Sequence, residues 1–141
     1  MRVLRTVEGL NCFLAPCRLP SADCQDRPSV GFVPTMGGLH GGHLSLIERA
    51  RQENEVVVVS LFLNPLQFAR GEDLDRYPRT PEQDLHLCEQ AQVNAVFMPT
   101  PQTLYQRLDP LAEELTQVVP PKSMTAVLCG PYRPGHFEGV A

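Results

Sequence analysis

Two histidines three positions apart, His40 and His43, are the residues of this chain whose types and spacing could do chemistry. An imidazole can bind a metal ion or donate a hydrogen bond to an anion. Two histidines make an incomplete metal site, and no nearby cysteine or acidic residue has ligand spacing. Histidines beside a glycine turn can be ordinary polar loop residues. The other alternative is that both rings donate hydrogen bonds to phosphate oxygens, which suits a turn that contains no lysine.

The elements around the histidines are predicted to be a strand, a glycine turn and a helix. Valine and phenylalanine dominate residues 30–33, which predicts a short strand covered on both faces. The apolar side chains of Leu44, Ile47 and Ala50 share one face of the predicted helix. Four glycines allow positive φ and a close approach to a ligand: Gly37, Gly38, Gly41 and Gly42. A helix that begins at such a turn directs its free amides and its dipole at an anion, most often phosphate.

A second strand is predicted over residues 55–63, a continuous β-branched and apolar run typical of a central parallel strand. Strand, helix and strand then form a right-handed unit, and ligands bind beyond the carboxyl ends of such strands. Asn64 and Gln67 follow this strand, so their amides should lie beside the histidine turn. They could hold a hydroxyl or a carboxylate, or they could serve only to form the turn.

The rest of the chain predicts an α/β fold, Rossmann-like, with a parallel sheet. Residues 1–5 are predicted to form an edge strand and residues 95–99 a third strand. Thr80, Pro81 and Gln83 predict a capping box at the start of a helix.

Several connecting segments carry weaker signals. Residues 69–79 are charged and poor in aliphatic side chains, which predicts a long loop near the site. Residues 108–115 suggest a short helix and residues 116–119 a strand. Residues 130–140 are predicted to form a rigid turn in which Arg133 and His136 are candidate anion contacts, although a solvated turn is the alternative.

Composition limits the class of protein. The chain has 141 residues and a net charge of −4, which gives no general attraction to nucleic acid or to an anionic membrane. No apolar run is long enough to span a bilayer and the N-terminus has no secretory signal, so we predict a single cytoplasmic domain. The five cysteines form no Cys-x-x-Cys pair and are predicted to be reduced, small apolar residues.

Four short stretches carry a resemblance to a known family. They are Pro-Thr-Met-Gly-Gly-Leu-His-Gly-Gly-His at 34–43, Asn-Pro-Leu-Gln-Phe at 64–68, Arg-Tyr-Pro-Arg-Thr at 76–80 and Arg-Pro-Gly-His-Phe at 133–137. The histidine motif resembles the ATP signature of the nucleotidyltransferase superfamily that includes class I aminoacyl-tRNA synthetases. Together the stretches resemble the pantothenate synthetase (pantoate–β-alanine ligase) family, in the cyanobacterial form that is often fused to a cytidylate kinase.

The resemblance implies an activity and a set of site residues. Members of this family form pantoyl adenylate and pyrophosphate from pantoate and ATP, and β-alanine then displaces AMP. His40 and His43 would be catalytic: both would steady the phosphates, and His43 would donate a proton. The ATP-binding residues would be Pro34, Thr35, Met36, Gly37, Gly38, Leu39, His40, Gly41, Gly42 and His43. The substrate-binding residues would be Asn64, Gln67, Tyr77, Arg133 and His136. The resemblance also implies Mg²⁺ carried on the ATP phosphates, rather than a protein metal site, and a homodimer.

The chain departs from the family pattern in two ways. Gly38 and Gly41 occupy positions that often carry a side chain. The segments that supply lysine, aspartate and arginine to close over ATP are absent, as is the small lid domain. We therefore expect residues 1–141 to be an N-terminal, truncated nucleotide-binding domain that is inactive alone. Two alternatives stay open: a non-catalytic nucleotide-binding fragment, and another adenylyltransferase of the same superfamily.

Overall fold

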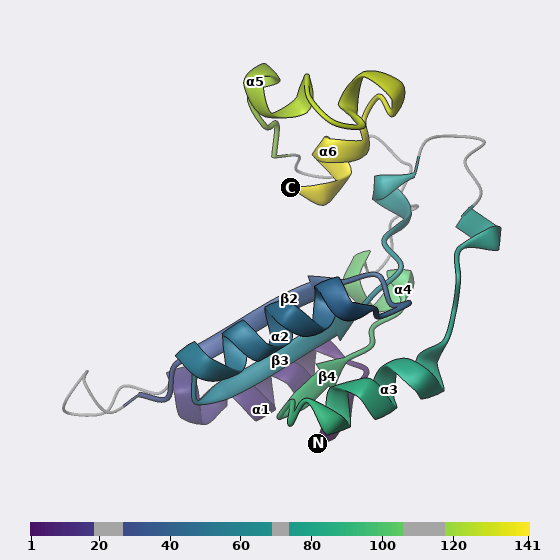
Figure 1. Ribbon diagram of the computed structural model, residues 1–141. Coiled ribbons are helices and arrows are strands. Elements are labelled where there is room, and N and C mark those ends of the chain that lie inside the picture. The colour runs from purple at the N-terminus through teal and green to yellow at the C-terminus, as the bar shows by residue number, and fades with distance from the viewer. Residues whose placement is uncertain (19–26, 69–73, 106–117) are drawn as a thin grey trace.

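Four parallel strands form one sheet in the computed structural model, which describes residues 1–18, 27–68, 74–105 and 118–141 (Figure 1). The strand order is β1-β4-β3-β2. The strands are β1 (Arg2–Leu4), β2 (Val30–Thr35), β3 (Val56–Leu61) and β4 (Ala95–Phe97). The predicted α/β class, the parallel sheet, the edge position of β1 and the central position of β3 are confirmed.

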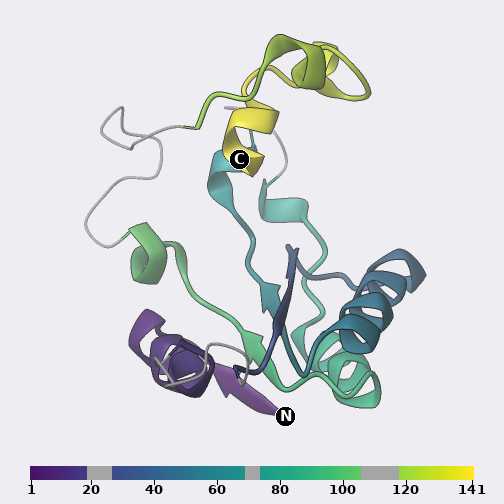
Figure 2. The ribbon, with the colours of Figure 1, turned by 90° about the vertical axis from the view of Figure 1, so that its left-hand side faces the viewer.

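Three longer helices cover the two faces of the sheet (Figure 2). Helix α1 (Val7–Arg18) lies on one face, and α2 (Gly41–Glu53) and α3 (Pro81–Gln90) lie on the other. The remaining helical elements are short: η1 (Pro65–Gln67), η2 (Leu74–Arg76), α4 (Pro101–Tyr105), α5 (Lys122–Thr125), η3 (Gly130–Tyr132) and α6 (His136–Val140). No helix within the four described ranges is long and apolar enough to cross a membrane.

The larger core lies between the sheet and helices α2 and α3. Its fully buried members are Ile47, Val57, Val59, Cys88 and Val96. Leu44 and Ala50 pack against the same cluster, so the predicted apolar face of α2 is confirmed. Burial raises the pKa of the Cys88 thiol to about 11, which keeps this cysteine protonated and unreactive.

Strand β2 differs from its prediction, because it is an edge strand with only one face covered. Gly31, Val33 and Thr35 are buried beneath α2, whereas Val30 and Phe32 on the other face are 38% and 56% exposed. Helix α1 packs over β3 and β4 instead, and no strand of the described ranges pairs with the outer side of β2. The expectation that β2 is covered on both faces is therefore wrong.

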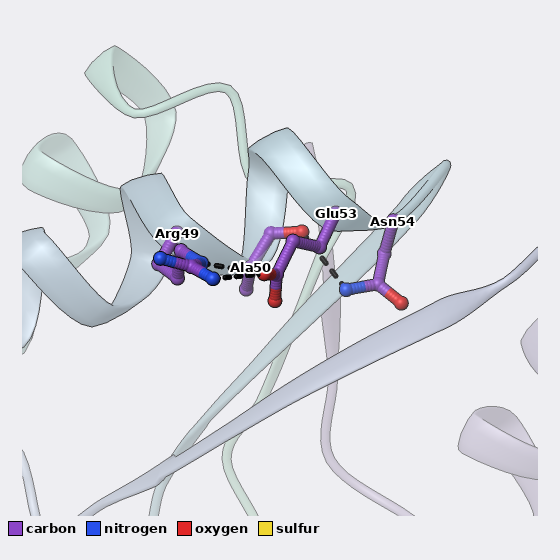
Figure 3. A network of polar contacts seen from close by, with 4 residues as sticks. All are labelled: Arg49, Ala50, Glu53 and Asn54. Carbon is purple, nitrogen blue, oxygen red and sulfur yellow. Dashed lines mark hydrogen bonds and ion pairs between the residues drawn. The ribbon is translucent and has the colours of Figure 1, made fainter.

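A glycine in β2 lets α2 approach the sheet closely. A Cβ atom at Gly31 would lie 2.8 Å from Nδ2 of Asn54 and 3.1 Å from Cβ of Ala50. Asn54 Nδ2 donates to the Ala50 carbonyl oxygen at 3.0 Å, which closes the last turn of the helix (Figure 3). The ion pair between Arg49 and Glu53 lies on the exposed side of the same turn and contributes little. Gly31 thus fixes the C-terminal end of the helix whose N-terminal end carries the histidines.

The start of α3 also differs from its prediction. Pro81 occupies the first turn as expected, but the Thr80 side chain makes no capping bond. Its hydroxyl donates instead to Oδ1 of Asp84 at 3.4 Å. The capping box expected at Thr80 and Gln83 is therefore wrong.

Residues 118–141 lie beyond the carboxyl ends of the strands (Figures 1 and 2). Helix α6 packs against η1, where Nδ2 of Asn64 donates to the Gly139 carbonyl oxygen at 3.0 Å. The predicted turn at 130–140 contains η3 and α6. The expected helix at 108–115 and residues 116–117 of the expected strand lie outside the described residues, and Val118 and Val119 are exposed and not in a strand. Of the expected loop at 69–79, residues 74–79 are described and contain η2.

Candidate active site

The glycine turn between β2 and α2 contains two positive-φ residues, Gly37 at 87° and Gly38 at 64°. Gly41 and Gly42 are the first two residues of α2 instead. The expectation of positive φ is therefore correct for the first pair of glycines and wrong for the second. A side chain at Gly38 would be strained by its φ, whereas Gly41 has open space around its Cβ position.

Side chains of β2 and α3 hold this turn in place. Thr35 Oγ1 accepts from the Gly37 amide at 3.2 Å and donates to the Ser60 carbonyl oxygen at 2.7 Å. The Asp84 carboxylate accepts from the amides of Gly38 and Leu39 at 2.9 and 2.8 Å. Asp84 is a site residue that sequence reasoning missed. It lies four positions before the buried Cys88, so it had to face the core, and a charge there requires partners.

The two histidines cap the helix that they begin. His40 is the N-cap residue, and its Nδ1 accepts from the Gly42 amide at 3.1 Å. His43 Nδ1 accepts from the His40 amide at 3.4 Å, and the two ring centroids are 4.1 Å apart. A backbone amide can only donate, so neither Nδ1 carries a proton in these bonds. Each neutral ring therefore has its proton on Nε2, and the turn presents two imidazole donors side by side.

The surroundings of His43 favour the neutral ring. Burial lowers the pKa of His43 and the neighbouring His40 lowers it further, while the charge of Asp84 acts in the opposite direction. With a pKa below its usual value of 6.5, the ring is neutral at pH 7 and retains the Nε2 donor.

Most backbone amides of the turn already donate within the protein. These are the amides of Gly37, Gly38, Leu39, His40 and Gly42. The expectation that the amides of this turn would bind an anion therefore fails for these five in the structure as it stands. The imidazole Nε2 groups are further donors that these capping bonds do not use.

A cleft of about 540 Å³ lies next to His43, at the carboxyl ends of β2 and β3. Seven of the predicted site residues line it: Pro34, Thr35, Met36, His43, Asn64, Gln67 and Tyr77. Phe32, Phe62, Phe97 and Leu104 supply much of the apolar wall. Gly37 and Asp84 line a second cleft of about 370 Å³ that shares Met36 and Pro99 with the first. The other turn residues, Gly38, Leu39, His40, Gly41 and Gly42, line neither cleft.

Asn64 lies in the cleft with its polar atoms engaged. Its Oδ1 accepts from the Leu66 amide at 3.0 Å and from the Tyr105 hydroxyl at 2.9 Å, and its Nδ2 holds Gly139. Burial raises the pKa of Tyr105, so this hydroxyl keeps its proton and remains a donor. A substrate donor could bind Oδ1 only by replacing one of its two bonds, whereas Nδ2 has a second N–H group besides the one that Gly139 accepts.

Arg133 and His136 reach the site through Gln67 and do not line the cleft. Arg133 donates to the Gln67 carbonyl oxygen at 3.1 Å, and His136 Nδ1 donates to the same oxygen at 2.8 Å. The Arg133 guanidinium also lies 5.8 Å from the ring centre of Phe68. Both residues therefore position the segment that carries Gln67, and the structure does not bring them to an anion site with the histidines.

The described ranges contain no group of three or more histidine, cysteine, aspartate or glutamate side chains arranged to hold a metal ion.

Gly41 and Gly42 offer a matched pair of substitutions. A Cβ atom at Gly42 would lie 2.9 Å from Cε1 of His40, whereas nothing lies within 4 Å of one at Gly41. We expect Gly42→Ala to displace the His40 ring and break its bond to the Gly42 amide. Gly41→Ala should leave the ring in place and gain up to about 1 kcal/mol of helix propensity. Urea unfolding and the ring ¹⁵N shifts of His40 measure the two effects, and equal behaviour of the two variants would contradict the close contact.

Comparison with known proteins agrees with this architecture. A sequence model of the family described as Pantoate-beta-alanine ligase matches residues 2–141. The bifunctional pantoate ligase/cytidylate kinase of Trichormus variabilis is 51% identical over 154 residues, which cover 100% of this chain and 29% of the relative. The protein of the same name from Acaryochloris marina is 53% identical over 146 residues, which cover 99% of this chain and 26% of the relative.

Solved structures give the same result. The pantothenate synthetase of Thermus thermophilus matches with a TM-score of 0.80 and 46% identity, over 99% of this chain and 45% of that one. The pantoate-beta-alanine ligase of Francisella tularensis, solved with beta-gamma ATP and beta-alanine, matches with a TM-score of 0.81 and 34% identity, over 99% and 49%. This chain thus spans less than a third of these curated relatives and about half of these solved chains. Both the Rossmann-like fold and the family resemblance are confirmed, and the chain belongs to the pantoate–β-alanine ligase family.

Proposed function

We propose that this chain binds ATP at His40 and His43 and binds pantoate in the adjoining cleft, within an enzyme that joins pantoate to β-alanine. The observation that carries the proposal is the pair of imidazole Nε2 donors beside a cleft that extends to Gln67. The ligase from Francisella tularensis, solved with a form of ATP and with beta-alanine, supports the choice of ligands.

The cleft has the chemistry that pantoate requires. Pantoate carries two methyl groups on one carbon, and the apolar wall of Phe62, Met36 and Leu104 suits them. Its hydroxyls and carboxylate need polar partners, which the Gln67 amide and the Tyr77 hydroxyl in the same lining can supply. A mainly apolar cleft with few polar groups is typical of a small-molecule site.

The proposed reaction has two steps. The pantoate carboxylate attacks the α-phosphorus of ATP, the bond to the β-phosphate bridging oxygen breaks, and pyrophosphate leaves with the electron pair. The β-alanine amine then attacks the acyl carbon of pantoyl adenylate, and AMP leaves. In the first step negative charge moves toward the pyrophosphate, where the two imidazole donors stabilise it through hydrogen bonds. The family resemblance gives His43 the role of proton donor, but a ring that is neutral at pH 7 donates a hydrogen bond rather than a proton, so hydrogen-bond donation is the role proposed for it. Holding pantoate and ATP next to each other increases the rate of the first step further, because the two reactants are already oriented for reaction.

Mg²⁺ would enter this site as a companion of ATP. Mg²⁺ in nucleotide sites is coordinated mainly by phosphate oxygens and water. We therefore propose a metal carried by the nucleotide, as the family resemblance implies. When bound, Mg²⁺ neutralises phosphate charge and leaves the imidazole donors to orient the triphosphate.

The family also suggests a wider setting for the chain. We propose a homodimer that works in the cytoplasm, with pantoate and β-alanine as its small-molecule partners and with neither nucleic acid nor membrane. The names of the curated relatives above join a pantoate ligase to a cytidylate kinase, which supports such a fusion here.

A chimeric enzyme tests the proposed function. This chain would replace the matching part of the Thermus thermophilus pantothenate synthetase, with which it is 46% identical. We expect the chimera to release pyrophosphate only when pantoate is present and to release AMP when β-alanine follows. The chain alone should bind ATP without turnover, as titration calorimetry and the same assay would show. Release of pyrophosphate with phosphopantetheine in place of pantoate would reassign the chain to an adenylyltransferase.

A further inference from the structure

Asp84 connects helix α3 to the glycine turn, although the two are far apart in sequence. Its side chain is 2% exposed. One carboxylate oxygen accepts from the Gly38 amide at 2.9 Å and the other from the Leu39 amide at 2.8 Å. A Cβ atom at Gly37 would lie only 3.1 Å from Oδ2. The carboxylate therefore lies close to three successive residues of the turn, Gly37, Gly38 and Leu39.

Only a carboxylate suits this position. Its two oxygens accept from two parallel backbone donors, and hydrogen bonds to a charged acceptor are stronger than neutral ones. The side chain of asparagine has the same size but offers only one oxygen and one NH₂ group. Its NH₂ group is a donor and would face one of the two backbone amides, which is also a donor, so no hydrogen bond could form there. A buried donor without a partner is costly, so the turn would have to move.

The same carboxylate also binds the segment that carries Tyr77. Thr80, which ends the segment carrying Tyr77, donates its hydroxyl to Oδ1 of Asp84 at 3.4 Å. Gly38 lies against this segment as well, since a Cβ atom there would be 3.9 Å from the Pro78 carbonyl oxygen. Asp84 thus lies between the turn that leads to His43 and the segment that leads to Tyr77, and both residues line the cleft.

We propose that Asp84 is a positioning residue of the nucleotide site: by holding the Gly38 and Leu39 amides it fixes the start of α2 and so the direction of the two imidazole donors. This inference rests on the proposed function for its role in ATP binding, and its structural part stands apart from it. Asp84 does not touch the cleft that receives pantoate, and it acts through His40 and His43.

The charge of Asp84 also affects the pKa of His43, which an uncharged side chain that only supported the turn would not do. Two titratable groups act on His43: His40 from the N-cap of α2, which lowers its pKa, and Asp84 from α3, which raises it. Removing the negative charge should therefore lower the pKa of His43 further. The ring would then stay neutral to a lower pH than in the native chain.

The test compares Asp84→Asn with Glu82→Gln in this chain. Glu82 lies in the same first turn of α3 but is exposed, so its variant controls for the loss of one negative charge at that helix end. We expect Asp84→Asn to mix the two tautomers of the His40 and His43 rings in ¹⁵N spectra and to lower the pKa of His43. We also expect at least about tenfold weaker ATP binding in titration calorimetry, the size of effect that one unsatisfied buried donor produces. Glu82→Gln should match the native chain in all three readouts.

A measurement without substitution keeps the inference testable if Asp84→Asn does not fold. Couplings through hydrogen bonds should connect the Gly38 and Leu39 amide nitrogens to the Asp84 carboxyl carbon in the native chain. Their absence overturns the inference, as does an Asp84→Asn variant that folds and matches Glu82→Gln in tautomer, pKa and affinity. If these couplings and ring effects are present but the native chain binds no ATP, the proposed function fails while the positioning of the rings by Asp84 stands.

Discussion

His43→Ala is expected to lower pantoate-dependent pyrophosphate release by the chimeric enzyme by roughly 10²- to 10³-fold, the usual effect of removing one positioned hydrogen-bond donor from a developing negative charge. His43 lines the cleft, and its proton is on Nε2 because Nδ1 accepts from the His40 amide. The substitution removes this donor and also leaves the His40 amide without its acceptor. The rate of pyrophosphate release at saturating ATP and pantoate is the measurement.

Two further substitutions sharpen this prediction. His86→Ala removes an exposed histidine on α3, outside both clefts, and should leave the rate unchanged. His43→Gln keeps an amide N–H donor but cannot give up a proton at pH 7. If the rate of pyrophosphate release by His43→Gln lies between those of the native residue and His43→Ala, His43 acts as a hydrogen-bond donor. If His43→Gln is as slow as His43→Ala, His43 acts by proton transfer. Near-native activity of His43→Ala would refute its role.

Ile47→Ala is expected to cost the chain about 2–5 kcal/mol of unfolding free energy, out of the roughly 5–15 kcal/mol that a domain possesses. Ile47 is fully buried in the middle of α2 and belongs to the core cluster that includes Cys88 and the sheet residues Val57, Val59 and Val96. Truncation leaves a cavity under the helix that carries both histidines, so the helix should lose stability first. Urea unfolding monitored by circular dichroism measures the change.

The neighbouring position supplies the control for this substitution. Leu46 is 57% exposed on the outer side of the same helix, so Leu46→Ala removes the same volume of side chain without a cavity. Its unfolding free energy should stay within about 0.5 kcal/mol of the native value. A loss at Leu46 as large as that at Ile47 would show that the core is not where the structure places it.

The local parts of the site could be predicted from the sequence. Strand, turn and helix follow from patterns within about a dozen residues, and the apolar face of α2 follows from the spacing of Leu44, Ile47 and Ala50. The neighbourhood of Asn64, Gln67 and the histidine turn follows from the rule that parallel strands end at one edge of the sheet. Each of these inferences needs only the chain near the residue in question.

The parts that failed depend on contacts between distant segments. The hydrogen bonds of the Asp84 carboxylate join positions 45 and 46 residues apart. The spacing to Cys88 indicates that Asp84 faces the core, but no local pattern identifies the amides that it binds. The Thr80 hydroxyl binds that same carboxylate and so does not cap α3. The anion contacts expected of Arg133 and His136 stay a prediction, and the structure adds what no local pattern indicates: each donates a hydrogen bond to the Gln67 carbonyl oxygen, 66 and 69 residues away.

The local signals are also misleading in two places. Four glycines in one turn suggest four unusual backbone conformations, but Gly42 is required by the His40 ring that lies against it. The apolar strand at 30–35 suggests two buried faces, because composition cannot tell a central strand from an edge strand whose second face forms a cleft. Phe32 shows the difference, since it is both exposed and part of the cleft wall.

The edge position of β2 has a practical consequence for work with this chain. No described strand pairs with the backbone donors and acceptors along its outer side. The exposed aromatic ring of Phe32 adds apolar surface beside them. Such an edge is a template for pairing with a second molecule, although the missing N–H of Pro34 shortens the row of donors. Concentrated samples are therefore expected to self-associate and to lose colloidal stability, and light scattering across a dilution series would reveal the onset.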